Sequence, residues 1–282
     1  MKRKKFTPVI MVFVLLIGLS LLLYPTIADK WNAYHQSRAI IRHAENMAKF
    51  SEEEVETFRS AADDFNRSLA KNGGRWSFTP AEREKYESLL VTDDTNIMCY
   101  VEIPKIKVSL PVYHGTGNDV LQGAIGHLEG SSLPVGGKGT HSVLSGHRGL
   151  PSAKLFTDLD KLVEGDTFML YTLNEILTYE VDQIRVVLPS DLSTLQIDPD
   201  KDYCTLFTCT PYGINTHRLM VRGHRIENLP GAIVITAEAL QIDEKAVSLS
   251  IGIPLTVLIF TVAMIKPQKS RLSVKERLKQ EV

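Results

Sequence analysis

The sequence predicts a mostly β fold with an N-terminal helical extension and a transmembrane helix at each end. Three observations predict it. Short segments rich in Val, Ile, Leu and Thr are split by Gly, Pro and Asp turns over residues 96–228, which is typical of a β-barrel or sandwich. Helical apolar spacing occupies residues 29–95, and an uncharged apolar run lies near each end. The net charge of −1 does not indicate a nucleic-acid partner.

The first apolar run covers residues 6–28 and follows the basic start Lys2–Lys5. About 20 apolar residues are enough to span a bilayer as a helix. A cleaved signal peptide has the same features, and Thr26-Ile27-Ala28 is a weak cleavage site. The run is long for a signal core, and no clear small-x-small motif ends it. We therefore predict an uncleaved anchor over residues 1–28.

The second apolar run covers residues 246–265 and is followed by a basic tail, residues 266–282. A buried core helix is the alternative, but charge flanks this run on both sides and it lies at the chain end. Pro254 is tolerated as a kink in a membrane helix. The positive-inside rule places both basic ends in the cytoplasm. The sequence thus predicts a two-pass protein of the cell membrane, with residues 29–245 outside.

Residues 29–95 are predicted to be helical. A stalk continues to about residue 48, and Ser51 with Glu54 forms a capping box that begins a second helix, ended by Gly73-Gly74. Thr79 with Pro80 begins a third helix, which runs to about Leu90. Between them, residues 75–78 are expected to form a linker with exposed aromatic side chains. The second helix carries an apolar stripe that we expect to pack on the main domain: Val55, Phe58, Ala62, Phe65 and Leu69.

Residues 96–228 form the predicted β domain, joined to the second membrane span by a linker, residues 229–245. Short helices fit at Asp119–Ile125 and Ala153–Leu159. The expected strands are Met98–Ile103, Val108–Tyr113, His141–Gly146, Thr167–Tyr171, Leu177–Leu188, Tyr203–Cys209 and Arg218–Ile226.

Three cysteines are an odd number for an exported domain, so at least one thiol is expected to be unpaired and reactive. Cys204 and Cys209 are five residues apart on one predicted strand and therefore point to opposite faces. We interpret Cys99 and Cys204 as small buried hydrophobic residues. The sequence has no CxxC pair and no tight Cys/His cluster, so neither a metal site nor a cofactor is expected.

Cys209 and Arg218 lie on either side of a turn-rich loop. A hairpin of this kind brings a thiol close to a guanidinium, which favours nucleophilic acyl chemistry if a proton-transferring group joins them. His147 is the strongest candidate, because it follows a strand and a Gly turn. His114, His127 and His141 also lie near Gly-rich turns, where hydrogen-bonded structural histidines are common, and spacing alone leaves the choice open.

Two segments resemble the sortase motifs. Val143-Leu144-Ser145-Gly146-His147 resembles the histidine motif, Thr205-Leu206-Phe207-Thr208-Cys209 resembles the cysteine motif, and Arg218 stands where sortases have an arginine. Further segments between about Met98 and Arg225 resemble the class C, pilus-assembling sortases of Gram-positive bacteria. These are residues 101–106, 110–116, 126–130, 132–137, 154–160 and 209–215.

The resemblance implies a sortase-type closed β-barrel with two membrane spans, and a cysteine transpeptidase. Cys209 is then the nucleophile that forms a thioester with the LPXTG-like sorting signal of a pilin subunit. His147 is the proton donor and acceptor, and Arg218 stabilises the oxyanion or the substrate. A Lys amine of another pilin resolves the thioester. Ser145 and Thr208 flank the site as candidate substrate contacts.

Class C sortases also carry a lid with an Asp-Pro-aromatic motif, in which the Asp pairs with the catalytic arginine. At the comparable place this sequence has Gly74-Arg75-Trp76, without Asp-Pro. Trp76 is therefore the candidate lid residue in a lid that is weak or held differently, and packing between two helices is the alternative role. Other functional alternatives are a hydrolytic cysteine peptidase, a housekeeping sortase that anchors proteins to the cell wall, and a non-catalytic pilus assembly scaffold.

Overall fold

The computed structural model describes residues 6–228 and the single residues 252 and 256. The predicted linker at residues 229–245, the predicted C-terminal span and the basic tail lie outside the described residues, except for those two positions. Of the described residues, 28–228 belong to one compact unit, which contains the β domain.

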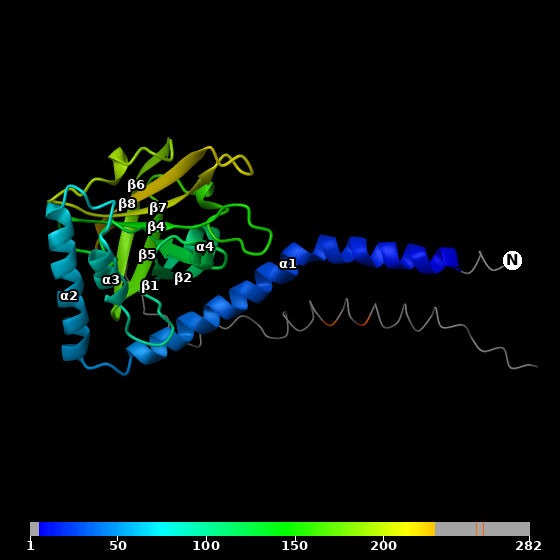
Figure 1. Ribbon diagram of the computed structural model, residues 1–282, viewed down its shortest axis with the longest axis horizontal. Coiled ribbons are helices and arrows are strands. Elements are labelled where there is room, and N and C mark those ends of the chain that lie inside the picture. Colours follow the sequence, from blue (N-terminus) through cyan, green and yellow to red (C-terminus); the bar gives the residue numbers. More distant parts are fainter. Residues whose placement is uncertain (1–5, 229–251, 253–255, 257–282) are drawn as a thin grey trace, which may run out of the picture. The chain divides into compact units, whose positions relative to one another are not determined.

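Eight strands form a closed barrel in the order β1-β2-β3-β4-β7-β8-β6-β5 (Figure 1). This confirms the predicted closed β-barrel. Most neighbours are antiparallel, but β2 pairs with β3 and β4 pairs with β7 in parallel. The strands are β1 (Cys99–Ile103), β2 (Val108–His114), β3 (Ile125–His127), β4 (Thr140–Ser145), β5 (Thr167–Thr172), β6 (Glu175–Val187), β7 (Asp202–Thr210) and β8 (His217–Ile226).

Two local predictions in the barrel were wrong. The helix expected at Asp119–Ile125 is only α4 (Asn118–Leu121), and the chain then enters β3, which was not predicted. The helix expected at Ala153–Leu159 is a series of turns, with a short 3-10 helix at Leu159–Lys161. Leu155 has φ = +38°, which a right-handed helix excludes, although its side chain still packs in the core.

The N-terminal helix α1 runs from Phe6 to Met47, so the predicted helical stalk is confirmed. Within the described residues, one stretch, Phe13–Met47, is long and apolar enough to cross a membrane by length and composition. Exposed apolar side chains such as Phe13, Leu15 and Leu22 suit such a role. Further along, Ile40 is buried against Tyr100 and other residues of the barrel surface.

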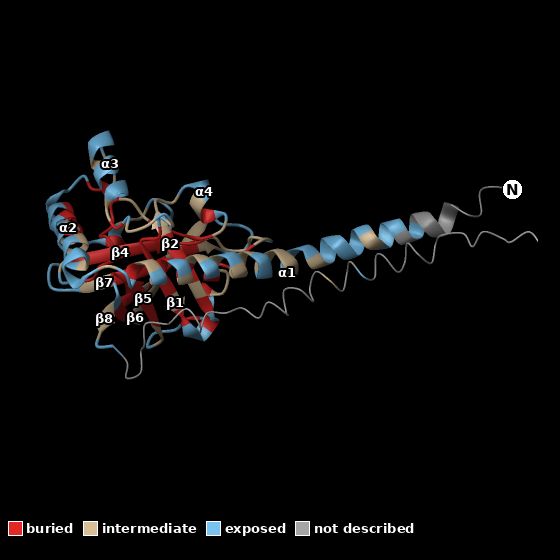
Figure 2. Ribbon diagram, turned by 90° about the horizontal axis from the view of Figure 1, so that it is seen from below, coloured by how far each residue is buried: buried red, intermediate tan, exposed pale blue. Residues whose placement is uncertain are grey.

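Helices α2 (Glu52–Lys71) and α3 (Pro80–Ser88) begin at the predicted capping boxes of Ser51 and Thr79. The apolar stripe of α2 packs with α3 and with the outside of the barrel, as predicted. This cluster includes Phe65, Leu69, Tyr86, Met98 and Leu133. Figure 2 shows the barrel strands buried and the outward faces of α2 and α3 exposed. Cys99 and Cys204 lie in the barrel core and are fully buried, which confirms their interpretation as buried hydrophobic residues.

Candidate active site

The three predicted site residues lie at the ends of three neighbouring strands. β7 and β8 are antiparallel and place Cys209 directly opposite Arg218. β4 and β7 are parallel, with Ser145 beside Phe207. The pairing continues past the end of β4, because the Gly146 amide donates to the Phe207 carbonyl at 3.1 Å. His147 follows Gly146, so the register brings it level with Cys209.

All three residues belong to the outer face of the barrel. In β7, Cys204 and Leu206 point into the core, whereas Phe207 packs outside, so Cys209 shares the outer face with Phe207. The same alternation in β8 puts Leu219 inside and places Arg218 outside with Met220. All three cysteines are free, but only Cys209 is partly exposed, whereas Cys99 and Cys204 are buried. The predicted reactive thiol is therefore accessible at the barrel surface.

Arg218 is held by the turn between β7 and β8. Its Nη1 donates to the carbonyl oxygens of Asn215 at 3.2 Å and His217 at 3.1 Å. These contacts fix one arm of the guanidinium beside the thiol-bearing strand end. A fixed guanidinium is suited to donate hydrogen bonds to an oxygen that gains negative charge.

The competing histidines have structural contacts of their own. His127 is fully buried and bonds to Tyr86 and Ser132, and burial lowers its pKa to about 4. His141 is also buried, with Nδ1 at 2.8 Å from the Gln196 carbonyl and Nε2 at 2.7 Å from Thr205 Oγ1, and burial lowers its pKa to about 4. Both rings are therefore neutral near pH 7 and are engaged away from Cys209.

The two candidate substrate contacts are largely buried. Thr208 is 1% exposed, and its hydroxyl donates to the Gly146 carbonyl at 2.7 Å. This bond ties the histidine loop to the cysteine strand. Ser145 is 6% exposed at the end of β4. A contact of either residue with substrate stays a prediction.

Comparisons with known proteins agree with this geometry. A model of the sortase domain matches residues 101–226. The crystal structure of sortase C1 from Streptococcus agalactiae is 54% identical, with a TM-score of 0.66, and the match covers 68% of this chain and all of that one. The chain belongs to the sortase family. The predicted family is thus confirmed, and with it the enzyme class, cysteine transpeptidase.

Other relatives show how far the similarity extends. Sortase C-1 from Actinomyces oris is 41% identical over 62% of this chain and 99% of that one, with a TM-score of 0.58. Sortase D of Bacillus subtilis is 32% identical over 45% of this chain, and the match spans 62% of that protein's length. The solved neighbours named here are class C sortases, as the sequence motifs indicated.

The linker before α3 covers part of the outer face of this sortase. Trp76 is half-buried and packs against the cluster of Val143, Leu195 and Met220, against which Phe207 also packs. The prediction of exposed aromatic side chains in this linker was wrong, because Trp76 and Phe78 are both partly buried. Arg75 is buried as well, at 5% exposure. No apolar periodicity in the linker signals this burial, since the partners come from loops far away in sequence.

Arg75 is the anchor of the linker. Its Nη1 donates to the Gly130 carbonyl at 2.9 Å and its Nη2 to the Leu195 carbonyl at 2.6 Å. Its guanidinium also stacks on the Trp76 ring, 4.2 Å from the ring centroid. Two loops, before β4 and before β7, are therefore joined to the linker by one side chain.

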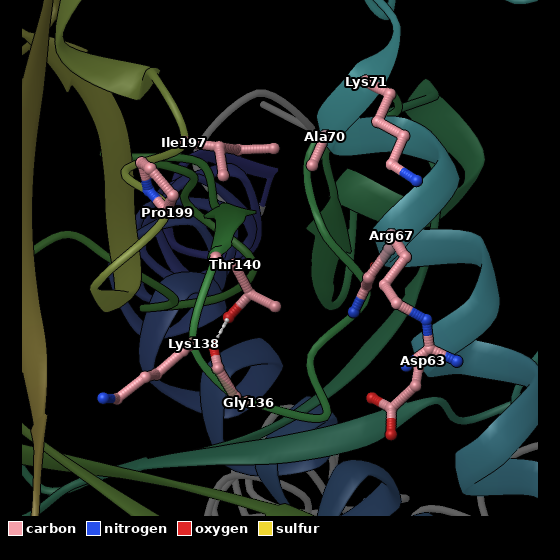
Figure 3. A pocket seen from close by; sticks show the side chains of 12 residues that line it. Asp63, Arg67, Ala70, Lys71, Gly136, Lys138, Thr140, Ile197 and Pro199 are labelled. Atoms are coloured by element: carbon pink, nitrogen blue, oxygen red, sulfur yellow. Dashed lines mark hydrogen bonds between the residues drawn. The ribbon is translucent and has the colours of Figure 1, made fainter.

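A cavity of about 450 Å³ lies near the other ends of β4 and β7. Figure 3 shows Asp63, Arg67 and Lys71 of α2 on one side and Lys138 and Thr140 on the other. Thr140 begins β4, so the cavity is roughly 20 Å along the strand from His147. This cavity is separate from the predicted site. Among the described residues, no group of three His, Cys, Asp or Glu side chains is placed to hold a metal ion.

Proposed function

We propose that this sortase cleaves an LPXTG-like sorting signal of pilin subunits and joins it to a Lys amine of another pilin. The observation that carries the proposal is the strand register. Cys209 on β7 lies directly opposite Arg218 on β8, and it is level with His147, two residues past the end of β4. A thiol, an imidazole and a guanidinium at one exposed edge are the groups that acyl transfer needs.

The first half of the reaction forms a thioester. The Cys209 thiolate attacks the Thr carbonyl of the sorting signal, and Arg218 donates hydrogen bonds to the oxyanion. When the carbon–nitrogen bond breaks, His147 protonates the leaving Gly amine. The C-terminal fragment departs, and the pilin stays on Cys209 as a thioester.

The second half transfers the pilin to an amine. A Lys side chain of a second pilin attacks the thioester carbonyl, and His147 takes the proton that this amine loses. The carbon–sulfur bond breaks as the isopeptide bond forms. The Cys209 thiolate and the protonated His147 are restored for another cycle.

The chain is proposed to work at the outer surface of the cell membrane. Residues 1–28 and 246–265 are the two spans, residues 29–245 lie outside, and both termini lie in the cytoplasm. The exposed apolar side chains of α1 support the first span. Two anchors would hold Cys209 near the membrane, where it would meet pilin subunits.

Trp76 is proposed to be the lid of this site, held by Arg75 in place of an Asp-Pro motif. Trp76 and Phe207 pack against the same buried cluster, and Phe207 lies two residues before Cys209 on the same face of β7. A substrate peptide that approaches Cys209 along this face must displace the ring. The two hydrogen bonds of Arg75 to loop carbonyls make it the latch.

The proposal is tested by incubating the full-length chain, in detergent, with a purified pilin that carries a sorting signal. Covalent pilin ladders on a denaturing gel are expected, and Cys209→Ala should form none. Cleavage without ladders, even with amine present, indicates a hydrolytic peptidase. Ladders absent but product formed with a cell-wall peptide amine indicate a housekeeping sortase, and no reaction at all indicates a scaffold.

A further inference from the structure

Arg148, the residue after His147, connects the chain after β4 to the end of β7 and to the loop that follows Cys209. Its side chain is only 11% exposed and pairs through Nη2 with Asp160. Its Nη1 lies 3.4 Å from the hydroxyl of Thr210, the residue after Cys209. Its guanidinium carbon is 5.9 Å from the centroid of the Tyr212 ring. One charged side chain therefore reaches the cysteine loop at two points.

A second connection joins the same loops next to the first. Gly149 has φ = +78°, and a Cβ there would lie 2.8 Å from the Tyr212 ring, so the ring packs directly on the glycine backbone. The Gly149 amide also donates to the Thr157 hydroxyl at 3.1 Å. Both features restrict the chain directly after His147.

The chain before and at His147 is restricted as well. The amide of Gly146 donates to the Phe207 carbonyl, and its carbonyl accepts from the Thr208 hydroxyl. The His147 carbonyl accepts the Phe156 amide at 3.2 Å. The backbone of His147 is thus fixed on both sides. The contacts of Gly146, the Arg148–Thr210 contact and the Gly149–Tyr212 packing lead to the cysteine strand or its loop, whereas those to Phe156, Thr157 and Asp160 lead to the chain before β5.

We infer that Arg148, Asp160 and Tyr212 form a positioning clamp that holds His147 opposite Cys209. The inference rests on the proposed function, in which these two residues exchange the protons of acyl transfer. Proton transfer requires the imidazole within hydrogen-bond reach of the reacting atoms, and small displacements lower the rate strongly. Asp160 lies in the short 3-10 helix Leu159–Lys161, further along the β4–β5 connection, and fixes the direction of the guanidinium from there.

The residue types of the clamp are better suited to orienting His147 than to stabilising the fold. Arg148 Nε is buried and has no partner within the described part of the chain. A buried donor without a partner destabilises the fold, and an apolar side chain of similar size would avoid this penalty. Charged and aromatic contacts, by contrast, hold a planar guanidinium in one orientation.

The test compares Arg148 with Arg222, a matched arginine in the middle of β8, opposite Thr205. Arg222 forms a two-point ion pair with Asp182 and stacks on Tyr203 at 4.1 Å, so it has the same kinds of partner. Full-length chain in detergent is assayed for cleavage of an LPXTG peptide. Arg148→Ala and Asp160→Asn should lower kcat by about tenfold and about threefold, with KM within about twofold. Arg222→Ala and Asp182→Asn should leave both constants unchanged.

A second readout needs no substrate. In chain with ¹³C-labelled histidine, the ring signal of His147 is assigned by its loss in His147→Ala. Arg148→Ala and Asp160→Asn should shift this signal, Arg148→Lys should restore part of the shift and of kcat, and the Arg222 and Asp182 variants should do neither. The clamp is overturned if the signal or kcat is unchanged in Arg148→Ala and Asp160→Asn, or if the Arg222 and Asp182 variants change them in the same way. If the parent cleaves no sorting peptide, the proposed function fails, and the histidine signal alone then decides on the clamp.

Discussion

At the scale of single residues, we expect peptide cleavage to require the planar guanidinium of Arg218. Its guanidinium is held by two turn carbonyls opposite Cys209. A lysine ammonium carries the charge but cannot donate in two fixed directions. Arg218→Lys is expected to lower kcat/KM for peptide cleavage by about 100-fold or more. Arg225→Lys, at the far end of β8, is the control, and near-normal cleavage by Arg218→Lys would contradict the assigned role.

His147 and His141 lie on one strand and its extension, but only His147 is level with Cys209. His147→Ala is expected to abolish turnover because His147 is the imidazole assigned to protonate the leaving amine. His141→Ala should stay active, since His141 bonds to Gln196 and Thr205, although the protein should unfold more easily. Rates of cleavage and thermal unfolding are measured for both. Peptide cleavage by His147→Ala would contradict the role of His147 as proton donor and acceptor.

The buried histidines make stability depend on pH. Burial lowers the pKa of both His127 and His141 to about 4, whereas the unfolded chain protonates histidine near ~6.5. The contribution of each ring to the free energy of unfolding is therefore fully present above about pH 6.5. It is lost as the pH is lowered toward 4, by up to about 3 kcal/mol for each ring. Urea unfolding at pH 7 and 4.5 measures the loss. His127→Gln should lose less than the parent, and an equal loss would contradict this assignment.

At the scale of elements, segments rich in Val, Ile, Leu and Thr between Gly, Pro and Asp turns were sufficient to predict most of the barrel. Every strand except β3 lies within two residues of its predicted segment. β3 has three residues between glycine-rich turns, too few for a period to be recognised. The turns at residues 153–158 bury apolar side chains at helical spacing, and the sequence does not reveal the positive φ of Leu155 that excludes a helix.

The sequence indicated which residue types form the candidate site, but not the long-range strand pairing that brings them together. The hairpin of β7 and β8 follows from local sequence, so Cys209 and Arg218 could be paired directly. His147 depends on the parallel register of β4 and β7, which are separated by more than 50 residues and leave no local signal. The burial of Arg75 likewise depends on Gly130 and Leu195, both distant in sequence.

The linker before α3 is the element whose movement we expect to control access. Trp76→Ala or Arg75→Ala should raise the rate of Cys209 alkylation and of basal peptide cleavage severalfold, about 3- to 10-fold, because the outer face near Phe207 is uncovered. Phe78→Ala is the control, since Phe78 packs with α2 and α3 instead. Peptide mapping assigns the alkylated cysteine. Unchanged rates in Trp76→Ala would show that Trp76 has no gating role.

At the scale of the whole molecule, the barrel supplies a packed frame, and the strand ends at one edge carry the residues of the proposed chemistry. β4, β7 and β8 come from separate parts of the sequence and meet at this edge, and their core side chains position the chain that leads to His147, Cys209 and Arg218. The second membrane span remains a prediction from the apolar run at residues 246–265. It would keep the site near the membrane without taking part in the chemistry.

The central claim is that Cys209 carries the pilin as a thioester, and mass spectrometry tests it most directly. The full-length chain is incubated with an LPXTG peptide, quenched in acid and digested. We expect the acyl fragment on the peptide that contains Cys209, its loss on addition of an amine, and no adduct in Cys209→Ala. An adduct on another residue, or peptide cleavage that persists in Cys209→Ala, would contradict the account.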